Sequence, residues 1–337
     1  MKEIFINKKT WKTFTEEEMN DYIEKVFNYY RKNGFPYFNS NKNFRDKEFL
    51  KTKKYDFKNV IDKKNKTIKQ TMHGLSLAWS YMPHSWEIIC GNKKTPFEVF
   101  HDDELFMKVI KKRIKMGDNI SDNGIRKMLK LFTGTQSVSN FRPTAAAAIY
   151  SLFCKEGDTV WDFSSGFGGR LIGAELAKVN YIGTDPSTLT YNGLIELKND
   201  YIKNIECEIH KKGSEVFKPK EKSIDFIFTS PPYFNWEKYS NEETQSYKKF
   251  SSREEWINGY LFKTFCSCHY GLKDNSYMAI NIANIRIFKN LEDETINIAE
   301  KAGFKLVDTW KLALSNPSMI NKECSFKYEP IYIFKKI

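Results

Sequence analysis

The sequence is poor in the features that mark secreted and membrane proteins. Its 337 residues contain only six cysteines, which are scattered without a Cys-x-x-Cys pair or the regular spacing of a disulfide framework. No stretch approaches the roughly 18 uninterrupted apolar residues of a membrane span, and the charged N-terminal residues do not resemble a secretory signal. We therefore expect a soluble, cytoplasmic protein with reduced thiols and no membrane partner.

Metal-ligand patterns are also scarce. Residues 266–269 read Cys-Ser-Cys-His, but they fall in an expected helix, where adjacent side chains point in different directions. The spacing of the other candidates matches no common zinc pattern: His73, His84, Cys90 and His101. We predict that the protein holds no metal.

Acidic residues are outnumbered in the N-terminal part of the chain. The net charge is +12, and residues 1–139 contain 28 Lys and Arg against 17 Asp and Glu, whereas residues 140–337 contain 26 against 25. The excess is densest in residues 41–70, where lysines are interleaved with aromatic residues. That mixture suits a phosphate backbone with stacking partners nearby. The alternative is a lysine-rich composition that scatters basic residues over any solvated face.

The pattern of apolar residues changes near residue 140. Before it, helical spacing predicts helices at about 15–31, 102–116 and 121–131, and the lysine-rich stretch has no clear period. After it, short apolar strands alternate with helices, which is typical of a mostly parallel sheet covered on both faces. The expected strands are 159–163, 181–184, 206–210, 224–229, 277–283, 305–311 and 328–334, and the expected helices between them are 144–153, 171–178, 189–202, 253–270 and 292–302.

These patterns predict two domains. Residues 1–139 form a basic, mainly helical N-terminal region, and residues 140–337 form an α/β domain built on the sheet.

The first strand of the sheet domain runs into a glycine loop. Glycines let the backbone approach a ligand, and the helix that follows presents free main-chain amides there. Asp185 ends the next strand, 19 positions after Gly166, where an acid can accept hydrogen bonds from ribose hydroxyls. The two features together predict an adenosine-type cofactor without saying which one. The candidate contacts in and before the loop are Asp162, Ser164, Ser165, Gly166 and Gly168.

A third motif, Ser230-Pro231-Pro232-Tyr233, follows the strand expected at 224–229. Two consecutive prolines cannot continue a central strand, because each lacks the main-chain amide donor. The chain must leave the sheet here and deliver Ser230 and Tyr233 at the carboxyl edge, where such folds bind ligands.

The three motifs, in this order and at strand ends, resemble those of the amino-methyltransferases of DNA, whose motif is Ser, Asp or Asn followed by Pro-Pro-Tyr or Pro-Pro-Phe. The resemblance covers residues 140–337 and implies a class I (Rossmann-like) methyltransferase fold, a seven-stranded, mostly parallel sheet with an antiparallel last strand. It implies S-adenosylmethionine as the cofactor and duplex DNA, with the target base flipped out, as the partner. The loop departs from the family in reading Asp-Phe-Ser-Ser at residues 162–165, where relatives often have Asp-Pro-Phe.

The resemblance implies catalytic roles for Ser230, Pro231, Pro232 and Tyr233. The Ser230 hydroxyl and the Pro231 carbonyl would accept both N–H bonds of an exocyclic amino group, which favours a pyramidal nitrogen with its lone pair aimed at the methyl group. Tyr233 would stack on the flipped base. No covalent intermediate or metal is required.

Three further residues are implied as cofactor contacts. Phe141 and Thr144 precede the glycine-loop strand at the distance of a segment that closes over the cofactor in the family, although Phe141 could equally belong to the core. Glu215 follows the third strand, where relatives often have an acid near the adenine, and its alternative is a solvated turn residue.

The target of the reaction stays open. Ser as the first motif residue favours cytosine N4, with adenine N6 as a close alternative. An RNA base or a protein glutamine amide would present a similar nitrogen, and a catalytically silent nucleic-acid-binding module is a rival that the intact motifs disfavour. Target reading is expected from the basic N-terminal region, from residues 234–255 or from residues 315–327.

Overall fold

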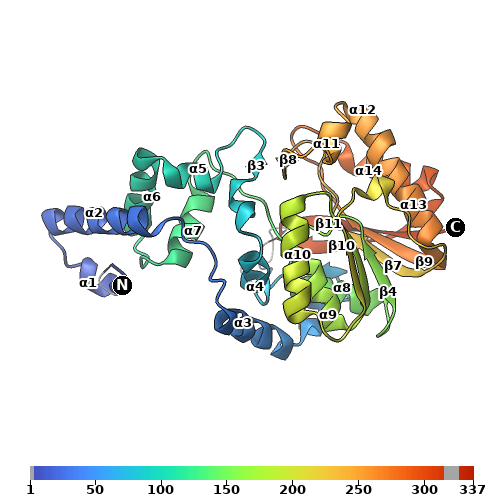
Figure 1. Ribbon diagram of the computed structural model, residues 1–337, viewed down its shortest axis with the longest axis horizontal. Coiled ribbons are helices and arrows are strands. Elements are labelled where there is room, and N and C mark those ends of the chain that lie inside the picture. Colours follow the sequence, from blue (N-terminus) through green and yellow to red (C-terminus); the bar gives the residue numbers. More distant parts are fainter. Residues whose placement is uncertain (1–3, 315–325) are drawn as a thin grey trace. The chain divides into compact units, whose positions relative to one another are not determined.

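Figure 1 shows the computed structural model of the chain, which describes residues 4–314 and 326–337. The chain divides into two units, the first made of Met1–Phe38 and Pro83–Ser139 and the second of Asn39–Met82 and Asn140–Ile337. The longer segment of the second unit begins at residue 140. Residues 39–82, however, were expected in the N-terminal region and instead pack with the sheet.

The first unit is helical. Its longest helix starts with a capping box in which the Glu18 amide donates to the Thr15 hydroxyl (3.2 Å) and the Thr15 amide donates to the Glu18 carboxylate (2.7 Å). All three helices expected here are present, and apolar and aromatic side chains such as Val26 and Phe106 form the core between them. The elements are α1 Lys8–Trp11, α2 Glu16–Asn33, η2 Pro83–Glu87, β3 Ile89–Cys90, α5 Pro96–His101, α6 Asp103–Lys115 and α7 Asp122–Leu131.

The second unit is built on a sheet with the strand order β1-β2-β10-β11-β9-β7-β4-β5-β6. The strands are β1 Ile61–Asp62, β2 Thr67–Ile68, β4 Thr159–Asp162, β5 Asn180–Thr184, β6 Cys207–His210, β7 Ile224–Thr229, β9 Leu272–Asn281, β10 Phe304–Ala313 and β11 Tyr328–Lys336, with the short β8 Glu237–Lys238 outside this sheet. The last strand, β11, runs antiparallel to both of its neighbours. All seven expected strands are present, and β1 and β2 extend the predicted seven-stranded sheet to nine strands within the described residues. The predicted α/β architecture, with a mostly parallel sheet and an antiparallel last strand, is confirmed.

Helices cover both faces of this sheet (Figure 1). One side carries α8 Pro143–Phe153, α9 Gly169–Ala177 and α10 Thr188–Tyr201, and the other carries α13 Lys263–Gly271 and α14 Leu291–Lys301. Between α13, α14 and the sheet lies an apolar core that includes Trp161, Ile227 and Phe265. The remaining elements are η3 Ser214–Val216, α11 Ser246–Lys249, α12 Arg253–Trp256 and the π-helical η4 Ile257–Phe262. No helix within residues 4–314 and 326–337 has the length and apolar character needed to cross a bilayer.

The lysine-rich stretch belongs to the second unit because it extends the sheet. Its elements are α3 Lys42–Lys54, η1 Phe57–Val60, the strands β1 and β2, and α4 Leu75–Ser80. Strand β2 pairs in parallel with β10, with Thr67 opposite Lys311. The sequence did not reveal α3, because Thr52 alone is buried within it and no apolar stripe marks a helix.

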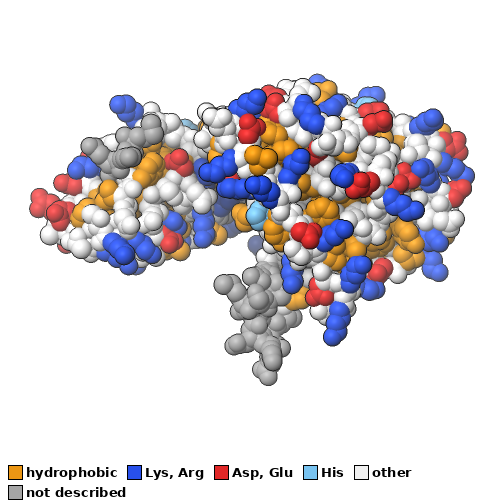
Figure 2. Space-filling view, turned by 90° about the horizontal axis from the view of Figure 1, so that it is seen from below, with side chains coloured by type: hydrophobic (Ala, Val, Ile, Leu, Met, Phe, Trp, Pro, Cys, Tyr) orange, Lys and Arg blue, Asp and Glu red, His pale blue; other side chains and the backbone are white. Residues whose placement is uncertain are grey.

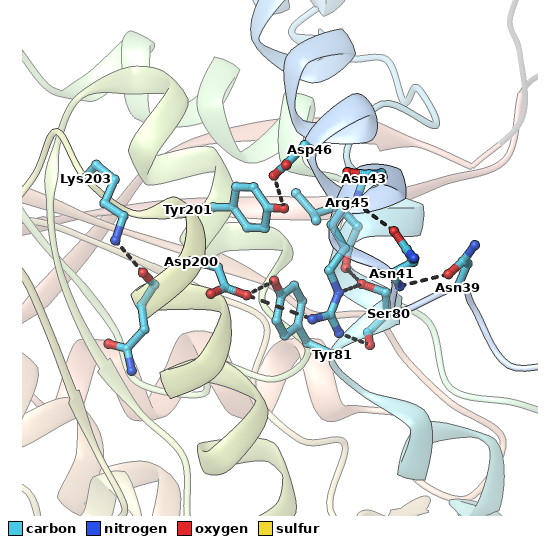
Figure 3. A network of polar contacts seen from close by, with 12 residues as sticks. Asn39, Asn41, Asn43, Arg45, Asp46, Ser80, Tyr81, Asp200, Tyr201 and Lys203 are labelled. Atoms are coloured by element: carbon cyan, nitrogen blue, oxygen red, sulfur yellow. Dashed lines mark hydrogen bonds and ion pairs between the residues drawn. The ribbon is translucent and has the colours of Figure 1, made fainter.

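A polar network joins α3 to α10 (Figure 3). The Arg45 guanidinium lies 3.6 Å from the centre of the Tyr81 ring and 3.9 Å from the Asp200 carboxylate. The Tyr81 hydroxyl donates to Asp200 (2.6 Å), and the Tyr201 hydroxyl donates to Asp46 (2.7 Å). The basic helix is therefore fastened to the sheet unit by directional contacts rather than by an apolar face.

We expect Arg45→Met to lower the free energy of unfolding by about 1–3 kcal/mol. The change removes the cation–π contact and two hydrogen bonds to Ser80, at 2.9 and 2.7 Å, from a side chain that is only 13% exposed. Denaturant unfolding measures the loss. The control is Lys47→Met on the exposed side of the same helix, which should stay within about 0.5 kcal/mol of the parent; equal losses in both variants would contradict the role given to the network.

Candidate active site

The structure brings the three sequence motifs to one edge of the sheet. Strands β5, β4 and β7 are neighbours and run parallel, so their carboxyl ends lie side by side. The glycine loop at residues 163–168 follows β4, Asp185 follows β5, and the Ser230-Pro231-Pro232-Tyr233 turn follows β7. The motifs therefore meet where a parallel sheet binds ligands.

Asp162 ties these strands together beneath the loops. Its carboxylate is fully buried and accepts hydrogen bonds from the Arg170 Nε (2.8 Å), the Tyr181 hydroxyl (2.7 Å) and the Thr229 hydroxyl (2.7 Å). These donors come from α9, β5 and β7. Because both carboxylate oxygens are occupied, the geometry favours a positioning role for Asp162 over the direct cofactor contact that the sequence predicted.

Arg170 continues this arrangement into the glycine loop. Its guanidinium donates to the Ser164 carbonyl and lies 5.7 Å from the centre of the Phe141 ring. Burial alone would lower the pKa of Arg170, but the attraction of Asp162 outweighs it and the pKa is raised above its ordinary value. The guanidinium therefore stays charged, and its hydrogen bonds fix the loop conformation.

The glycine loop requires its glycines. Gly166 and Gly168 have φ angles of +55° and +81°, in the left-handed region that side chains disfavour. A β-carbon at Gly168 would lie 2.6 Å from the Leu197 side chain, and one at Gly169 would lie 1.8 Å from the Phe141 carbonyl oxygen. The backbone at Gly168 and Gly169 is thus held close to its neighbours with no room for a side chain, whereas Gly166 is favoured by its positive φ.

Asp185 is the acid that faces the loop. Its carboxylate accepts the Gly166 amide on one oxygen (3.1 Å) and the Ser187 amide on the other (3.0 Å). Burial around the carboxylate raises the pKa of Asp185 to about 7, while these two hydrogen bonds oppose the rise. Each oxygen keeps a lone pair for a ligand hydroxyl.

The two loop serines point to different partners. The Ser164 hydroxyl lies 3.1 Å from the Tyr260 hydroxyl, whereas the buried Ser165 hydroxyl donates to the Asp162 carbonyl (3.3 Å). A β-carbon at Gly183 would lie 2.5 Å from the Ser165 oxygen, so Ser165 packs directly on β5. Sequence reasoning missed Tyr260, since its helix showed only apolar spacing.

Phe141 and Thr144 differ in their surroundings. The Phe141 ring is half-buried and packs edge-on against Phe228 at 5.1 Å. The Thr144 side chain is fully buried, and its hydroxyl lies 2.8 Å from that of Thr71. This position favours a packing role for Thr144 over the predicted cofactor contact. Asn140, which the sequence did not single out, donates to the Phe167 carbonyl (3.0 Å) and steadies the glycine loop.

Glu215 lies in a buried ion pair and not in a solvated turn. Its side chain is 3% exposed, and its carboxylate lies 2.6 Å from the Lys249 ammonium on α11. Glu242 lies shortly before α11 in the chain. Its carboxylate accepts hydrogen bonds from the Thr188 amide (2.9 Å) and hydroxyl (2.8 Å) at the start of α10. The chain that follows the Ser-Pro-Pro-Tyr turn is thus fastened to both loops that carry the predicted cofactor acids.

The Tyr233 hydroxyl lies against the first residue of its own motif. Burial raises the pKa of Tyr233 well above its ordinary value, and the charges of Glu329 and Glu237 add to this. Hydrogen bonds to the phenol from the Ser230 side chain and the Ala283 amide act in the opposite direction. Ser230 and Tyr233 therefore form one polar unit at the end of β7.

The chain offers His, Cys, Asp and Glu side chains as possible metal ligands. Within the described ranges, 4–314 and 326–337, no three of them gather so as to hold a metal ion. The Cys-Ser-Cys-His run lies on α13, with Cys266 exposed and Cys268 buried.

Comparison with protein families supports the chemistry that these motifs suggest. Residues 224–337 match the N6/N4 type of a family described as DNA methylase. The resemblance to amino-methyltransferases of DNA is thereby confirmed for this segment, which begins at β7 and includes the Ser-Pro-Pro-Tyr turn. It does not include the glycine loop or Asp185. No curated protein matches the chain.

Solved structures of methyltransferases share part of the architecture. A protein from Aquifex aeolicus described as a SAM-dependent methyltransferase is 19% identical, with 57% of this chain and 89% of that one covered and a TM-score of 0.40. A SAM-dependent O-methyltransferase from Thermotoga maritima is 14% identical, with coverages of 59% and 67% and a TM-score of 0.40. A transferase from Pyrococcus horikoshii is 12% identical at a TM-score of 0.38, and the match spans less than two thirds of its length, 64%, and 59% of this chain.

The raised pKa of Asp185 predicts a pH-dependent effect of Asp185→Asn on stability. The folded state holds the proton up to about pH 7, compared with an ordinary value of 3.8, so the wild-type protein loses stability as the pH rises through this window. The neutral amide escapes this loss. We expect Asp185→Asn to melt about 2–4 °C above the wild type at pH 8 and near it at pH 4.

Thermal unfolding between pH 4 and pH 8 measures this difference. The matched control is Asp21→Asn, an exposed acid on α2, whose effect should not change in the same way. A difference between Asp185→Asn and wild type that stays constant with pH would refute the assignment.

Proposed function

We propose that the chain is a cytoplasmic methyltransferase that moves a methyl group from S-adenosylmethionine to an exocyclic amino group of a DNA base, with cytosine N4 as the preferred target. The observation that carries this proposal is the position of the Ser-Pro-Pro-Tyr turn beside the glycine loop. The two are joined through the hydrogen bond from Thr229, the residue before the turn, to Asp162 (2.7 Å). The family match over residues 224–337 supports an amino group as the target.

The residues at the sheet edge fit S-adenosylmethionine. Asp185 offers lone pairs to ribose hydroxyls, and the N-terminus of α9 presents main-chain amides to the carboxylate of the methionine part. Glu215 lies on the third loop, where its pairing with Lys249 leaves the carboxylate able to accept further hydrogen bonds, such as those of the adenine amino group. When bound, the cofactor supplies a methyl group on a positively charged sulfur.

The chain's own residues contribute to the reaction by positioning the target amino group. The Ser230 hydroxyl and the Pro231 carbonyl accept the two N–H bonds of the target amino group and orient its lone pair. The Ser230 side chain lies beside the Tyr233 phenol, and its oxygen has lone pairs that can accept from the substrate. The Tyr233 ring stacks on the base, and Pro232 keeps the turn out of the sheet. Holding the two reactants in line contributes most of the acceleration.

Our choice of preferred base rests on the first motif residue. Ser at position 230, in place of Asp, favours cytosine N4 by resemblance, and adenine N6 is the second candidate because its amino group needs the same acceptors. Incubation with methyl-labelled S-adenosylmethionine and duplex DNA, single-stranded DNA or RNA, followed by mass spectrometry of the nucleosides, separates these products. N4-methylcytosine in DNA supports cytosine N4 as the target, and N6-methyladenine supports adenine N6 instead. If no nucleic acid is methylated, both targets are refuted.

We predict that Ser230→Ala and Tyr233→Ala each reduce methyl transfer at least about 100-fold, because positioning of the amino group is lost. Cofactor binding, measured by calorimetry, should stay within about 2-fold of the wild type, since these residues contact the base. The control Ser223→Ala lies next to the opposite end of β7 and should keep full activity. Full transfer by either motif variant would overturn the assigned roles.

We further propose that the lysine-rich segment binds the phosphate backbone. Its basic side chains are exposed and rigidly attached to the sheet unit through β2 and the Arg45 network. On the face drawn in Figure 2, Lys and Arg side chains are spread widely among acidic ones, so a general electrostatic surface is the alternative. The exposed lysines of this segment are Lys42, Lys47, Lys51, Lys53, Lys54, Lys58, Lys63, Lys64, Lys66 and Lys69.

The triple variant Lys51→Gln, Lys53→Gln, Lys54→Gln tests this contact. If these lysines touch phosphates, binding to duplex DNA weakens and the slope of log affinity against log salt falls by up to about 3. Fluorescence anisotropy at several salt concentrations measures both quantities.

The matched control removes the same charge elsewhere on the second unit. It replaces the exposed residues Lys220, Lys301 and Lys305 by Gln. If the two triple variants change DNA affinity and its salt dependence equally, the lysine-rich segment contributes only general electrostatic attraction.

A further inference from the structure

Tyr260 lies where the glycine loop meets the helix that follows the Ser-Pro-Pro-Tyr turn. Its side chain is 4% exposed, and its hydroxyl lies 3.1 Å from the Ser164 hydroxyl. The Trp256 ring packs against it with 5.2 Å between ring centres. The phenol is thus held by packing on one side and by the glycine loop at its polar end.

Groups of the other cofactor loops surround this hydroxyl. Burial raises the pKa of Tyr260 above its ordinary range, and hydrogen bonds with Ser164 and Ser214 act against the rise, whereas the charges of Glu215 and Asp185 add to it. These groups come from the glycine loop, from η3 and from the end of β5. Tyr260 is therefore close to all three loops to which we assign cofactor contacts.

Ser214 is fixed from the other side as well. Its hydroxyl lies 2.9 Å from that of Thr264, four residues after Tyr260 on α13, and both groups are buried. A single stretch of helix thus contacts the glycine loop through Tyr260 and η3 through Thr264. The spacing between the two loops depends on these hydroxyl contacts.

The helix is π-helical at this point. The segment η4 separates α12 from α13, and such wide turns are rare because their hydrogen bonding is less favourable than that of an α-helix. Gly259 allows close packing here, because a β-carbon would lie 2.3 Å from the Phe250 ring. The extra residue in the turn changes the direction in which Tyr260 projects relative to a continuous α-helix.

We propose that Tyr260 is a positioning residue of the cofactor site. Its hydroxyl contacts Ser164 while Thr264, on the same stretch of helix, contacts Ser214, and together these contacts set the distance between the loops that hold the two ends of the adenosine. This inference rests on the proposed function and adds a residue to its cofactor site. Tyr260 touches no reacting atom. It acts on binding and not on the transfer step.

The variant Tyr260→Phe removes the hydroxyl and keeps the packed ring. Calorimetry with S-adenosylmethionine and with S-adenosylhomocysteine should show affinities about 5- to 10-fold weaker, the effect of one lost buried hydrogen-bonding group. The KM for the cofactor should rise by the same factor while kcat stays within about 2-fold. A fall in kcat with unchanged cofactor affinity would overturn the proposal.

Two further variants separate positioning from general stability. Tyr332→Phe removes a hydroxyl from the same apolar core, one that donates to Glu292 on α14, and should leave cofactor affinity unchanged. Ser164→Ala should also weaken cofactor binding. The double variant Ser164→Ala, Tyr260→Phe should bind the cofactor no more weakly than the single variant with the lower affinity, because both changes remove the same contact.

The outcomes distinguish this inference from the proposed function. If the wild-type protein binds S-adenosylmethionine and Tyr260→Phe binds it equally well, or loses no more than Tyr332→Phe, the inference fails alone. If the wild-type protein binds neither S-adenosylmethionine nor its demethylated product, the proposed function fails and the inference falls with it.

Discussion

The buried carboxylate of Asp162 holds the candidate site in one arrangement. It receives hydrogen bonds from Arg170, Tyr181 and Thr229, which belong to a helix and two strands on either side of its own strand. An uncompensated charge at this depth would be very costly, so the carboxylate depends on these donors as much as they depend on it. Because Thr229 directly precedes the Ser-Pro-Pro-Tyr turn and Arg170 lies two residues after the glycine loop, the cofactor and target sides of the site share one anchor.

The charges around the site are largely neutralised within the protein. Asp162 is paired with Arg170, and Glu215 is paired with Lys249. Asp185 differs from both, because it is held by main-chain amides and its pKa is raised by burial to about 7. It is thus the acid best placed to respond to a ligand, since new hydrogen-bond donors or a nearby positive charge would stabilise its ionised form.

The lysine-rich segment and the catalytic motifs belong to the same unit. Pairing of β2 with β10 and the contacts of Arg45 with Tyr81 and Asp200 attach this segment to the sheet. A phosphate contact made by these lysines would therefore be rigidly linked to the site of chemistry. The segment at residues 315–327, a further candidate for target reading, lies mostly outside the described residues, as 315–325 are not among them.

The sequence by itself determined the order of strands and helices after residue 140 and the three motifs at strand ends, because apolar periodicity, glycine and proline act locally. It did not reveal α3, whose attachment depends on polar contacts with α10, or place residues 39–82 with the sheet. Only the tertiary structure shows that Asp162 and Thr144 are buried. It also shows that Tyr260 and Lys249 contact the cofactor loops. The positions of Thr144, Tyr260 and Lys249 depend on partners 34 to 96 residues away along the chain, which no local pattern encodes.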